Sequence, residues 1–367
     1  SGHTIEVSPG TYNEQVIVNK GLVIKGVGAV KPVMDFTGTV SGKPTLMDVS
    51  VQNVTIENMR MRVDMTKLNS AVIASGTNID NITITNDSVE AYGSSAAPTF
   101  GSYGNRNAFS INYSGPTNYR VAAGGVDNIT VQGNTVSGVL DDGYGVFRYF
   151  RAAVSVDEGG GLFTNNIFQS INHDVLVRFG SNGNVDVTNN QLNGGGVEFS
   201  DMNAGAGILT VSGNTFNGSF ANVAAANTAV LRLKNNYNFK TTMVSGNTFT
   251  GHMWGASVEN YNSLTFDNNT FTPASDSTTF HHIAINTKSI STNSNAIIQV
   301  SNSAVLTNNT FNYSGTNGGT ALSFHNHDND NAVIGSYTIG NAGNENTFNS
   351  GFSNFIYLDN QTGASNT

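Results

Sequence analysis

The region between residues 141 and 201 holds the densest set of side chains that could do chemistry. Its carboxylates include Asp141, Asp142, Asp157, Glu158, Asp174, Glu198 and Asp201, and its arginines are Arg148, Arg151 and Arg178. Carboxylate oxygens are the ligands that Ca²⁺ prefers, and the arginine fork binds a carboxylate in a fixed geometry. The region therefore has the composition of a site for calcium and an acidic polymer.

Specific roles follow from these residue types. Arg178 could act as the base of a β-elimination, and His173 could act as an acid or a base. The expected ligand contacts are Asp141, Asp142, Asp157, Glu158 and Asp174, and the expected calcium ligands are Asp141, Asp157 and Asp174. The alternative is that solvated turns collect Asp, Asn and Gly for conformational reasons alone.

A second polar cluster lies in the segment from Phe324 to Asp330. His325 and His327 are two residues apart, so on a strand both would face the same side and could bind one metal ion. Asp328 and Asp330 could add oxygen ligands for a hard cation. The alternative is a short exposed turn with no further ligand.

Aromatic residues mark two interruptions of the sequence pattern, which we interpret as loops. The segment 91–120 contains Tyr103 and Tyr113, and the segment 252–261 contains Trp254, the single tryptophan. Loops on a rigid scaffold often carry binding residues, and aromatic rings suit the faces of sugars. Equally, these rings could pack over an open side of the core.

A repeated phrase along the chain predicts the elements that position these groups. An alternating strand is followed by Asn, one further residue and an apolar side chain, as in the segment 209–216. Asn166, Asn190 and Asn214 follow one another at 24-residue steps. Such a period is typical of a solenoid whose coils contact their neighbours, whereas a β-sandwich would not repeat one turn residue in phase.

The same phrase predicts where side chains point. Asn166, Asn190 and Asn214 should stack as a ladder at one bend, each with a positive φ angle or a closely related turn conformation. The rings of Phe216, Phe249, Phe271 and Phe311 should lie in the core. In the strand 175–179, Val175 and Val177 alternate inward, so Leu176 and Arg178 should project outward. We expect Asp141, Asp157, Asp174 and Arg178 to converge on one face.

Composition excludes several classes of function. The 367 residues carry a net charge of −9, with 38% apolar and 11% charged residues. The 16 scattered Lys and Arg residues form no nucleic-acid groove, and no run of about 20 apolar residues could span a membrane. The absence of cysteine is compatible with an oxidising exterior. We expect one all-β domain over residues 1–367, as a segment of a longer protein with neighbouring domains.

The opening of the chain resembles a known family. The segment from Thr4 to Glu14, followed by Val16-Ile-Val and Leu22-Val-Ile-Lys-Gly26, is similar to the first coils of the pectin-lyase-like superfamily. The later Asn-Asn-x-Phe coils resemble repeats of the same superfamily. The resemblance implies a single-stranded right-handed parallel β-helix of about a dozen coils, of the bacterial secreted or surface type.

The motifs of that superfamily's enzymes are largely missing. The Gln-Asp-Thr segment of pectin methylesterases is absent, and of the polygalacturonase motifs only the pair Asp141-Asp142 occurs. The calcium site of pectate lyases has no fixed motif. Two functions therefore stay open: a non-catalytic stalk or adhesin that contacts a polysaccharide or cell-surface glycan, and a calcium-assisted polysaccharide lyase or related enzyme acting on an acidic polysaccharide.

Overall fold

The computed structural model describes twenty-one stretches of the chain, separated by gaps. They are residues 2–76, 79–93, 106–112, 126–137, 150, 152–157, 159–169, 173–178, 183–200, 207–218, 229–234, 241–252, 254–259, 261–273, 281–287, 290–291, 297–298, 303–313, 319–326, 336–349 and 351–360. Among these residues the structure contains strands and turns and no α-helix.

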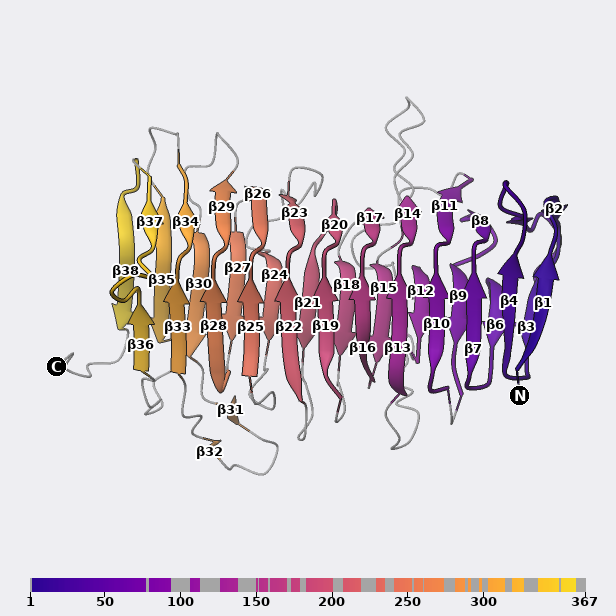
Figure 1. The fold of residues 1–367 in the computed structure, drawn as a ribbon, viewed down its shortest axis with the longest axis horizontal. Helices are drawn as coiled ribbons and strands as arrows, with labels where there is room; N and C mark the ends of the chain where they lie inside the picture. Colours follow the sequence, from indigo (N-terminus) through magenta and orange to yellow (C-terminus); the bar gives the residue numbers. More distant parts are fainter. Residues whose placement is uncertain are drawn as a thin grey trace. The chain divides into compact units, whose positions relative to one another are not determined.

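The chain forms two compact units, each built from three parallel sheets (Figure 1). Unit 1 comprises Ser1–Gly183 and Thr188–Gly195, and unit 2 comprises Asn184–Val187 and Gly196–Thr367. Within each unit, successive strands join sheet A, sheet B and sheet C in turn. A chain that returns to the same three sheets in rotation is a parallel β-helix, in which each strand pairs with its counterpart one coil away.

Unit 1 begins with the first strand of each sheet. Its sheet A contains β1 (His3–Val7), β4 (Leu22–Gly26), β7 (Val54–Glu57), β10 (Ile82–Thr85), β13 (Val126–Gln132) and β16 (Gly159–Thr164). Its sheet B contains β2 (Thr11–Tyr12), β5 (Val33–Asp35), β8 (Arg60–Asp64), β11 (Ser88–Tyr92), β14 (Thr135–Ser137), β17 (Ile167–Gln169) and β20 (Gln191–Leu192). Its sheet C contains β3 (Val16–Val18), β6 (Thr45–Val49), β9 (Ser70–Ala74), β12 (Asn107–Ile111), β15 (Ala152–Asp157) and β18 (His173–Arg178).

Unit 2 repeats the arrangement. Its sheet A contains β19 (Val185–Thr188), β22 (Ile208–Ser212), β25 (Thr241–Ser245), β28 (Ser263–Asp267), β33 (Ser303–Thr307) and β36 (Ser336–Ile339). Its sheet B contains β23 (Thr215–Asn217), β26 (Thr248–His252), β29 (Thr270–Pro273), β34 (Thr310–Phe311) and β37 (Thr347–Phe348). Its sheet C contains β21 (Val197–Ser200), β24 (Ala229–Lys234), β27 (Trp254–Glu259), β30 (His281–Thr287), β35 (Thr320–Asn326) and β38 (Asn354–Asn360). The short strands β31 (Ile290–Ser291) and β32 (Ile297–Ile298) pair antiparallel.

Asparagine side chains form a hydrogen-bonded ladder along the coils of each unit. In unit 1, the Asn166 amide donates to Asn190 Oδ1 at 2.9 Å, and Asn190 Nδ2 donates to the carbonyl of Phe163 at 2.9 Å. The unit 2 ladder joins Asn214, Asn247, Asn269, Asn309 and Asn346. Five of these amides donate to both a side chain and a backbone carbonyl of neighbouring coils, namely those of Asn166, Asn214, Asn247, Asn269 and Asn309.

The positive φ angle lies one position before each of the three predicted ladder residues, which themselves belong to the same turn. The left-handed residues are Asn165 (φ 56°), Asn189 (φ 56°) and Gly213 (φ 66°), each directly before a ladder asparagine. One left-handed residue is enough to bend the chain, and the residue after it then turns its amide inward. By the same shift, the ladder position of the coil that contains Asn86 is occupied by Asp87, whose backbone N–H donates to Asn134 Oδ1 at 2.8 Å.

The ladder leads to a stability prediction. Asn190→Ala should lower the free energy of unfolding by about 1–3 kcal/mol, because the backbone N–H and amide of Asn166 and the carbonyl of Phe163 lose their partners in the interior. Urea denaturation followed by circular dichroism measures the loss. As the matched control, Asn189→Gly keeps the left-handed bend and should change stability far less. Equal losses in the two variants would contradict the assignment of the ladder to the second asparagine.

The core prediction for phenylalanine is confirmed. Phe216, Phe249, Phe271 and Phe311 are fully buried, and they stack on one another in unit 2. The ring centroids of Phe216 and Phe249 lie 4.5 Å apart, and those of Phe249 and Phe271 lie 4.4 Å apart. The spacing is close to the separation of neighbouring strands in a sheet, about 4.8 Å, so one ring per coil fills the interior.

The two segments interpreted as loops contain strands, so that interpretation is wrong for their described parts. Ala91 and Tyr92 end β11, and the residues of β12 are all buried. In the second segment, β27 begins at Trp254, and Ala256 and Val258 alternate into the core. In β27 the apolar residues Ala256 and Val258 alternate with other residues, and this alternation is typical of a strand even though the segment breaks the repeat.

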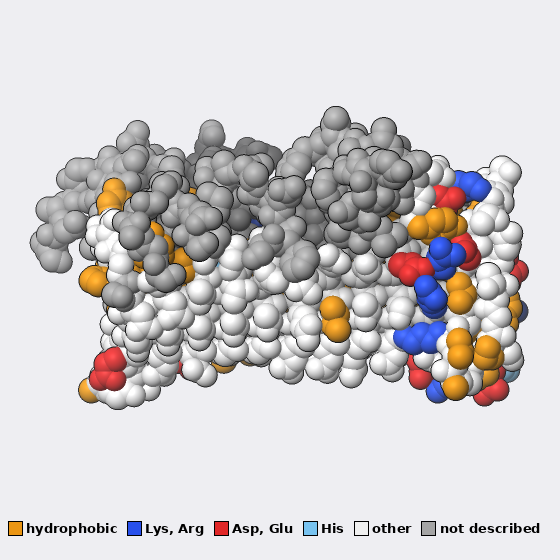
Figure 2. Space-filling view, turned by 90° about the horizontal axis from the view of Figure 1, so that it is seen from above, with side chains coloured by type: hydrophobic (Ala, Val, Ile, Leu, Met, Phe, Trp, Pro, Cys, Tyr) orange, Lys and Arg blue, Asp and Glu red, His pale blue; other side chains and the backbone are white. Residues whose placement is uncertain are grey.

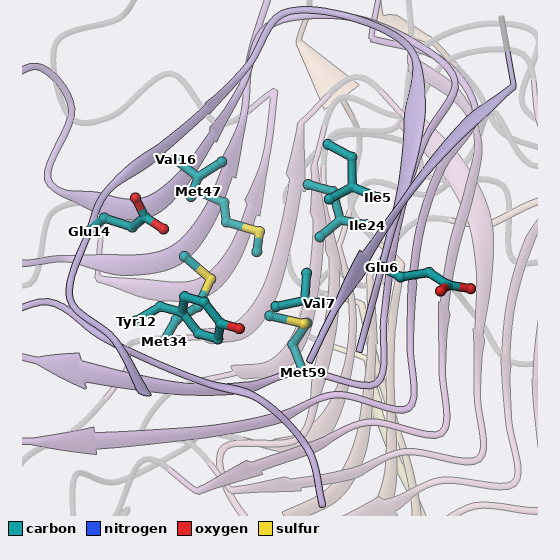
Figure 3. A pocket seen from close by; sticks show the side chains of 10 residues that line it. All are labelled: Ile5, Glu6, Val7, Tyr12, Glu14, Val16, Ile24, Met34, Met47 and Met59. Carbon is teal, nitrogen blue, oxygen red and sulfur yellow. The ribbon is translucent and has the colours of Figure 1, made fainter. Parts of the chain in front are cut away.

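A hollow lies where the core of unit 1 meets its first strands (Figure 3). Its volume is about 280 Å³, and it is lined by Ile5, Glu6, Val7, Tyr12, Glu14, Val16, Ile24, Met34, Met47 and Met59. The methionine thioethers line it, whereas the Glu6 side chain points away from the other labelled residues (Figure 3). Because its lining is mainly apolar, the hollow is a poor place for acid–base chemistry.

Candidate functional site

The predicted chemical region falls on sheet C of unit 1, where β12, β15 and β18 are neighbours. Ser110 is the register partner of Ser155, which in turn pairs with Leu176. Val154 and Val156 pair with core residues, so Ser155 and Asp157 lie on the opposite, outward side of the sheet. We call this outward side of β12, β15 and β18, with Asn112 directly after β12, the sheet C surface.

The sheet C surface is polar but shielded from solvent. Ser155 is 0% exposed, Ser110 3%, Asp157 5% and Asn112 6%, although all four belong to the outward side. Leu176, which the sequence predicts to project outward, is 1% exposed. A sheet side that carries hydroxyl, amide and carboxylate groups away from water has the environment in which electrostatic interactions are strong.

The hydrogen bonds of the sheet C surface leave the hydroxyl of Ser155 without a partner among the described residues. Asn112 Nδ2 donates to the backbone carbonyl of Asp157 at 3.0 Å, which ties the end of β15 to the coil before it. Ser155 Oγ is buried and has no hydrogen-bond partner among the described residues. Because buried polar groups are nearly always hydrogen-bonded, an unpartnered hydroxyl marks a place where a water molecule or a ligand group fits.

The predicted site residues are described to different extents. Asp157 and Arg178 are register partners on β15 and β18, and His173 pairs with Ala152 at the other end of β18. For Asp174 the structure describes the backbone, within β18. Six predicted site residues lie outside the described residues, namely Asp141, Asp142, Glu158, Tyr103, Tyr113 and His327. The register thus brings together Asp157 and Arg178, and the wider convergence stays a prediction.

Two further predicted residues lie on sheet C of unit 2. Trp254 is half-buried at the start of β27, as the register partner of Ala229 and His281, so it is a strand residue rather than a loop residue. His325 lies in β35, as the register partner of Asn286 and Asp359. Binding by Trp254 and metal ligation by His325 therefore stay predictions.

A buried ion pair also lies on this sheet in unit 2. Arg232 Nη1 is 2.9 Å from Glu198 Oε2, and their side chains are 9% and 11% exposed. Arg232 Nε also donates to the carbonyl of Ala229 at 2.7 Å. Removing either partner would leave a buried charge without its counterion. This pair therefore serves the structure of the sheet better than it serves proton transfer.

The calcium prediction finds little support among the described side chains. No group of three or more His, Cys, Asp or Glu side chains in the described part of the chain is arranged to hold a metal ion. Of the predicted calcium ligands, only the Asp157 side chain is described, whereas Ca²⁺ takes six to eight oxygen ligands. Calcium therefore enters none of the steps proposed below.

A charged group on sheet B of unit 1 was not singled out from the sequence. We call Lys31, Asp35, Arg60, Arg62, Lys67, Glu90 and Tyr92 the sheet B cluster. Asp35, Arg62 and Glu90 are register partners on β5, β8 and β11. Arg62 Nη1 is 2.5 Å from Asp35 Oδ2, and Arg62 Nε donates to Glu90 Oε1 at 2.6 Å. Figure 2 shows basic and acidic side chains gathered over this part of unit 1.

Tyr92 fixes the centre of the cluster. Its ring lies under the Arg62 guanidinium, 4.6 Å from ring centroid to Cζ, and its hydroxyl donates to Asp35 Oδ1 at 2.5 Å. Burial and the hydrogen bond to Asp35 raise the pKa of Tyr92. Burial disfavours the charged Arg62 guanidinium, but the hydrogen bond with Glu90 and the charge of Asp35 outweigh it and raise its pKa. Tyr92 therefore stays protonated at neutral pH and acts as a support.

The sequence held one signal for this cluster. Arg60 and Arg62 are separated by one apolar residue, Met61, so on a strand both cations share a side. Their carboxylate partners are 27 and 28 residues away from Arg62, outside the 24-residue step. Without the register, the sequence does not place Asp35 and Glu90 beside them.

Comparisons with solved structures find the same fold in other proteins. The A-module of Azotobacter vinelandii mannuronan C-5 epimerase AlgE4 superposes with a TM-score of 0.54 at 14% identity, over 100% of this chain and 91% of that one. The A-module of AlgE6 from the same organism gives 0.53 at 11% identity, with the same coverage. The chain therefore shares the right-handed parallel β-helix fold of these structures.

Other comparisons add no family assignment. Endo-xylogalacturonan hydrolase of Aspergillus tubingensis matches with a TM-score of 0.35 at 13% identity, over 96% of this chain and 85% of that one. No family model matches the chain, and no curated protein matches it in sequence. Among the described residues, no helix is long and apolar enough to cross a membrane.

Proposed function

We propose that this protein is an extracellular β-helix that acts on an acidic polysaccharide at the sheet C surface of unit 1. The observation that carries the proposal is the solvent-shielded polar side of β12, β15 and β18, where Asp157 and Arg178 are register partners. The named activity of the AlgE4 and AlgE6 modules, epimerisation of mannuronan at C-5, supports a uronate polymer as the substrate class.

The proposed chemistry begins with removal of the C-5 proton of a uronate. This proton is α to the carboxylate, so its removal places negative charge on the carboxylate oxygens, and a nearby cation stabilises that charge. We assign this electrostatic role to Arg178 and the proton transfer to Asp157, its register partner. His173 lies at the other end of β18, in register with the core residue Ala152, so this step does not use it. Return of a proton to the opposite face gives epimerisation, whereas loss of the C-4 substituent gives an unsaturated product.

Deuterium exchange tests the proposal before the product is known. The protein is incubated with a panel of uronate polysaccharides in D₂O, with and without calcium. Incorporation of deuterium at C-5 is read by NMR, and unsaturated products are read by absorbance. We expect exchange with wild type, a loss of about 100-fold or more in Arg178→Ala, and little change in the control Asp127→Asn, an exposed carboxylate of β13. If the wild-type protein incorporates no deuterium at C-5 of any uronate polymer, the proposed enzymatic activity is refuted.

A second candidate function, a non-catalytic stalk or adhesin, is favoured by the outward side of sheet B in unit 2. Consecutive strands of this sheet carry a row of threonines that are register partners: Thr215, Thr248, Thr270, Thr310 and Thr347. Uncharged hydroxyl rows suit contact with a glycan more than they suit proton transfer. The Arg178→Ala variant separates the two functions. Lost turnover with retained binding indicates chemistry at the sheet C surface, whereas glycan binding without turnover that Arg178→Ala leaves unchanged supports the second function.

A further inference from the structure

The sheet B cluster of unit 1 carries more positive charge than its own carboxylates balance. Arg60 and Arg62 share Asp35 and Glu90, whose side chains are 12% and 30% exposed. A third carboxylate, Asp64, is 9% exposed and accepts hydrogen bonds from the backbone and hydroxyl of Thr66. The four cations of the cluster therefore face three carboxylates, of which Asp64 is the most buried, on a chain whose net charge is −9.

The two lysines of the cluster have no ion-pair partner among the described residues. Lys31 Nζ donates to Ser88 Oγ at 3.1 Å and to the carbonyl of Asn86 at 2.5 Å. Lys67 Nζ donates to the carbonyl of Thr37, and the Lys67 side chain is exposed. Neutral oxygens hold these ammonium groups in place without cancelling their charge, so each can still attract an anion.

Arg60 also keeps unused donors. Its Nη2 contacts both carboxylate oxygens of Glu90 at 3.0 Å, and the Arg60 side chain is 48% exposed. Nε and Nη1 make no hydrogen bond with the described residues, and guanidinium N–H groups match a carboxylate in pairs. Arg62, in contrast, is held by Asp35, Glu90 and Tyr92 and serves to fix the geometry of the cluster.

We infer that the sheet B cluster is a second binding surface, which holds a carboxylate-bearing polysaccharide chain through Lys31, Arg60 and Lys67. Arg60 shares a row with Ser88, to which Lys31 donates, so these two cations are neighbours, and Lys67 lies beyond the opposite end of β8. A ligand that meets all three must carry several anionic groups along its length. The inference adds a site to the proposed function and rests on it only for the choice of a uronate polymer.

Binding to polymannuronate, measured by isothermal titration calorimetry on the full chain, tests the inference. The variant is Arg60→Gln/Lys67→Gln, and the matched control is Lys20→Gln/Lys25→Gln, which removes the same charge elsewhere in unit 1. We expect the dissociation constant of the first variant to rise about tenfold or more, with a weaker salt dependence, and that of the control to rise less than about twofold. Arg60→Lys should keep most of the affinity, because it keeps the charge.

Several outcomes would overturn the inference. Unchanged affinity in Arg60→Gln/Lys67→Gln, or an equal loss in the control, would remove these residues from the site. Equal competition by double-stranded DNA would show a general attraction for polyanions, and equal binding of dextran would show that charge is irrelevant. If the wild type exchanges the C-5 proton and the cluster variant binds the polymer normally, only the proposed function is supported. If binding depends on the cluster but no exchange occurs, only the second binding surface is supported.

Discussion

The Asp87→Asn variant is expected to be more stable than the wild type, by an amount that grows as the pH rises. Asp87 occupies a ladder position that asparagine fills in the following coils. Its Oδ1 accepts a hydrogen bond from the backbone N–H of Met59 at 2.6 Å, whereas its Oδ2 is buried with no partner among the described residues. An ionised carboxylate therefore places an acceptor where the ladder uses a donor.

The next ladder residue shows what that donor does. Asn134 Nδ2 donates to the carbonyl of Ile84 at 2.9 Å and to Asn166 Oδ1 at 3.1 Å. A protonated Asp87 can supply one such hydrogen bond, and an ionised Asp87 can supply none. Burial raises the pKa of Asp87 to about 8, and the hydrogen bond from Met59 and the charge of Lys31 oppose this only in part.

The pH dependence has a definite sign. The pKa of Asp87 is higher in the folded chain, about 8, than its ordinary value of 3.8, so the folded state binds the proton more tightly. The stability that this proton contributes is fully present below pH 3.8 and is lost as the pH rises toward 8. Within that window the advantage of Asp87→Asn should grow by about 1.4 kcal/mol for each pH unit.

Urea denaturation of both proteins at pH 5, 6, 7 and 8 measures this difference. The control Asp127→Asn removes an exposed carboxylate of β13, and its stability should run parallel to that of the wild type. Parallel curves for Asp87→Asn and the wild type would mean that Asp87 is ionised in the folded protein over this whole range.

The second large effect is expected for Phe271→Ala, which should lower the free energy of unfolding by about 3–5 kcal/mol. The Phe271 ring is fully buried between Phe249, with centroids 4.4 Å apart, and Phe311, with centroids 5.3 Å apart. The His252 ring also meets its edge at 6.1 Å, and burial lowers the pKa of His252 to about 3, so this neighbour is neutral. Truncation leaves a cavity that stacked coils cannot easily close.

Denaturation and hydrogen exchange together measure this loss. Because coils contact mainly their neighbours, part of the loss should appear as faster exchange in β26, β29 and β34. The control is Phe355→Ala, whose side chain is 51% exposed and should cost much less. A loss for Phe271→Ala as small as that of the control would mean that the ring stack contributes little to stability.

The fold could be predicted because its signals repeat. Leu209 and Val211 alternate with polar residues and are buried, and an asparagine follows the bend in every described copy of the phrase except that of Asp87. An Asn-Asn pair does not reveal which of its two residues has the positive φ angle, so the sequence predicts the bend one residue too late. The copies with Gly213 before Asn214 do reveal it, since glycine takes the left-handed position at least cost.

The sites depend on spacings that do not repeat. Asp157 and Arg178 become neighbours only through the register of β15 and β18, and their separation of 21 residues differs from the 24-residue step. In the sheet B cluster the ion pairs span 27 and 28 residues. Segments between strands vary in length from coil to coil, so a fixed period cannot align side chains on different strands.

The ladder has a consequence for how such a chain can change its length. Asn247 and Asn269 make the same set of hydrogen bonds, each to the coil before and to the coil after, and each is followed by Thr-Phe. A whole coil between two such positions could be removed or duplicated, and the ends that meet would find the partners they had before. The molecule is in this sense a stack of interchangeable layers, whose number can change while the bond pattern at each seam is kept.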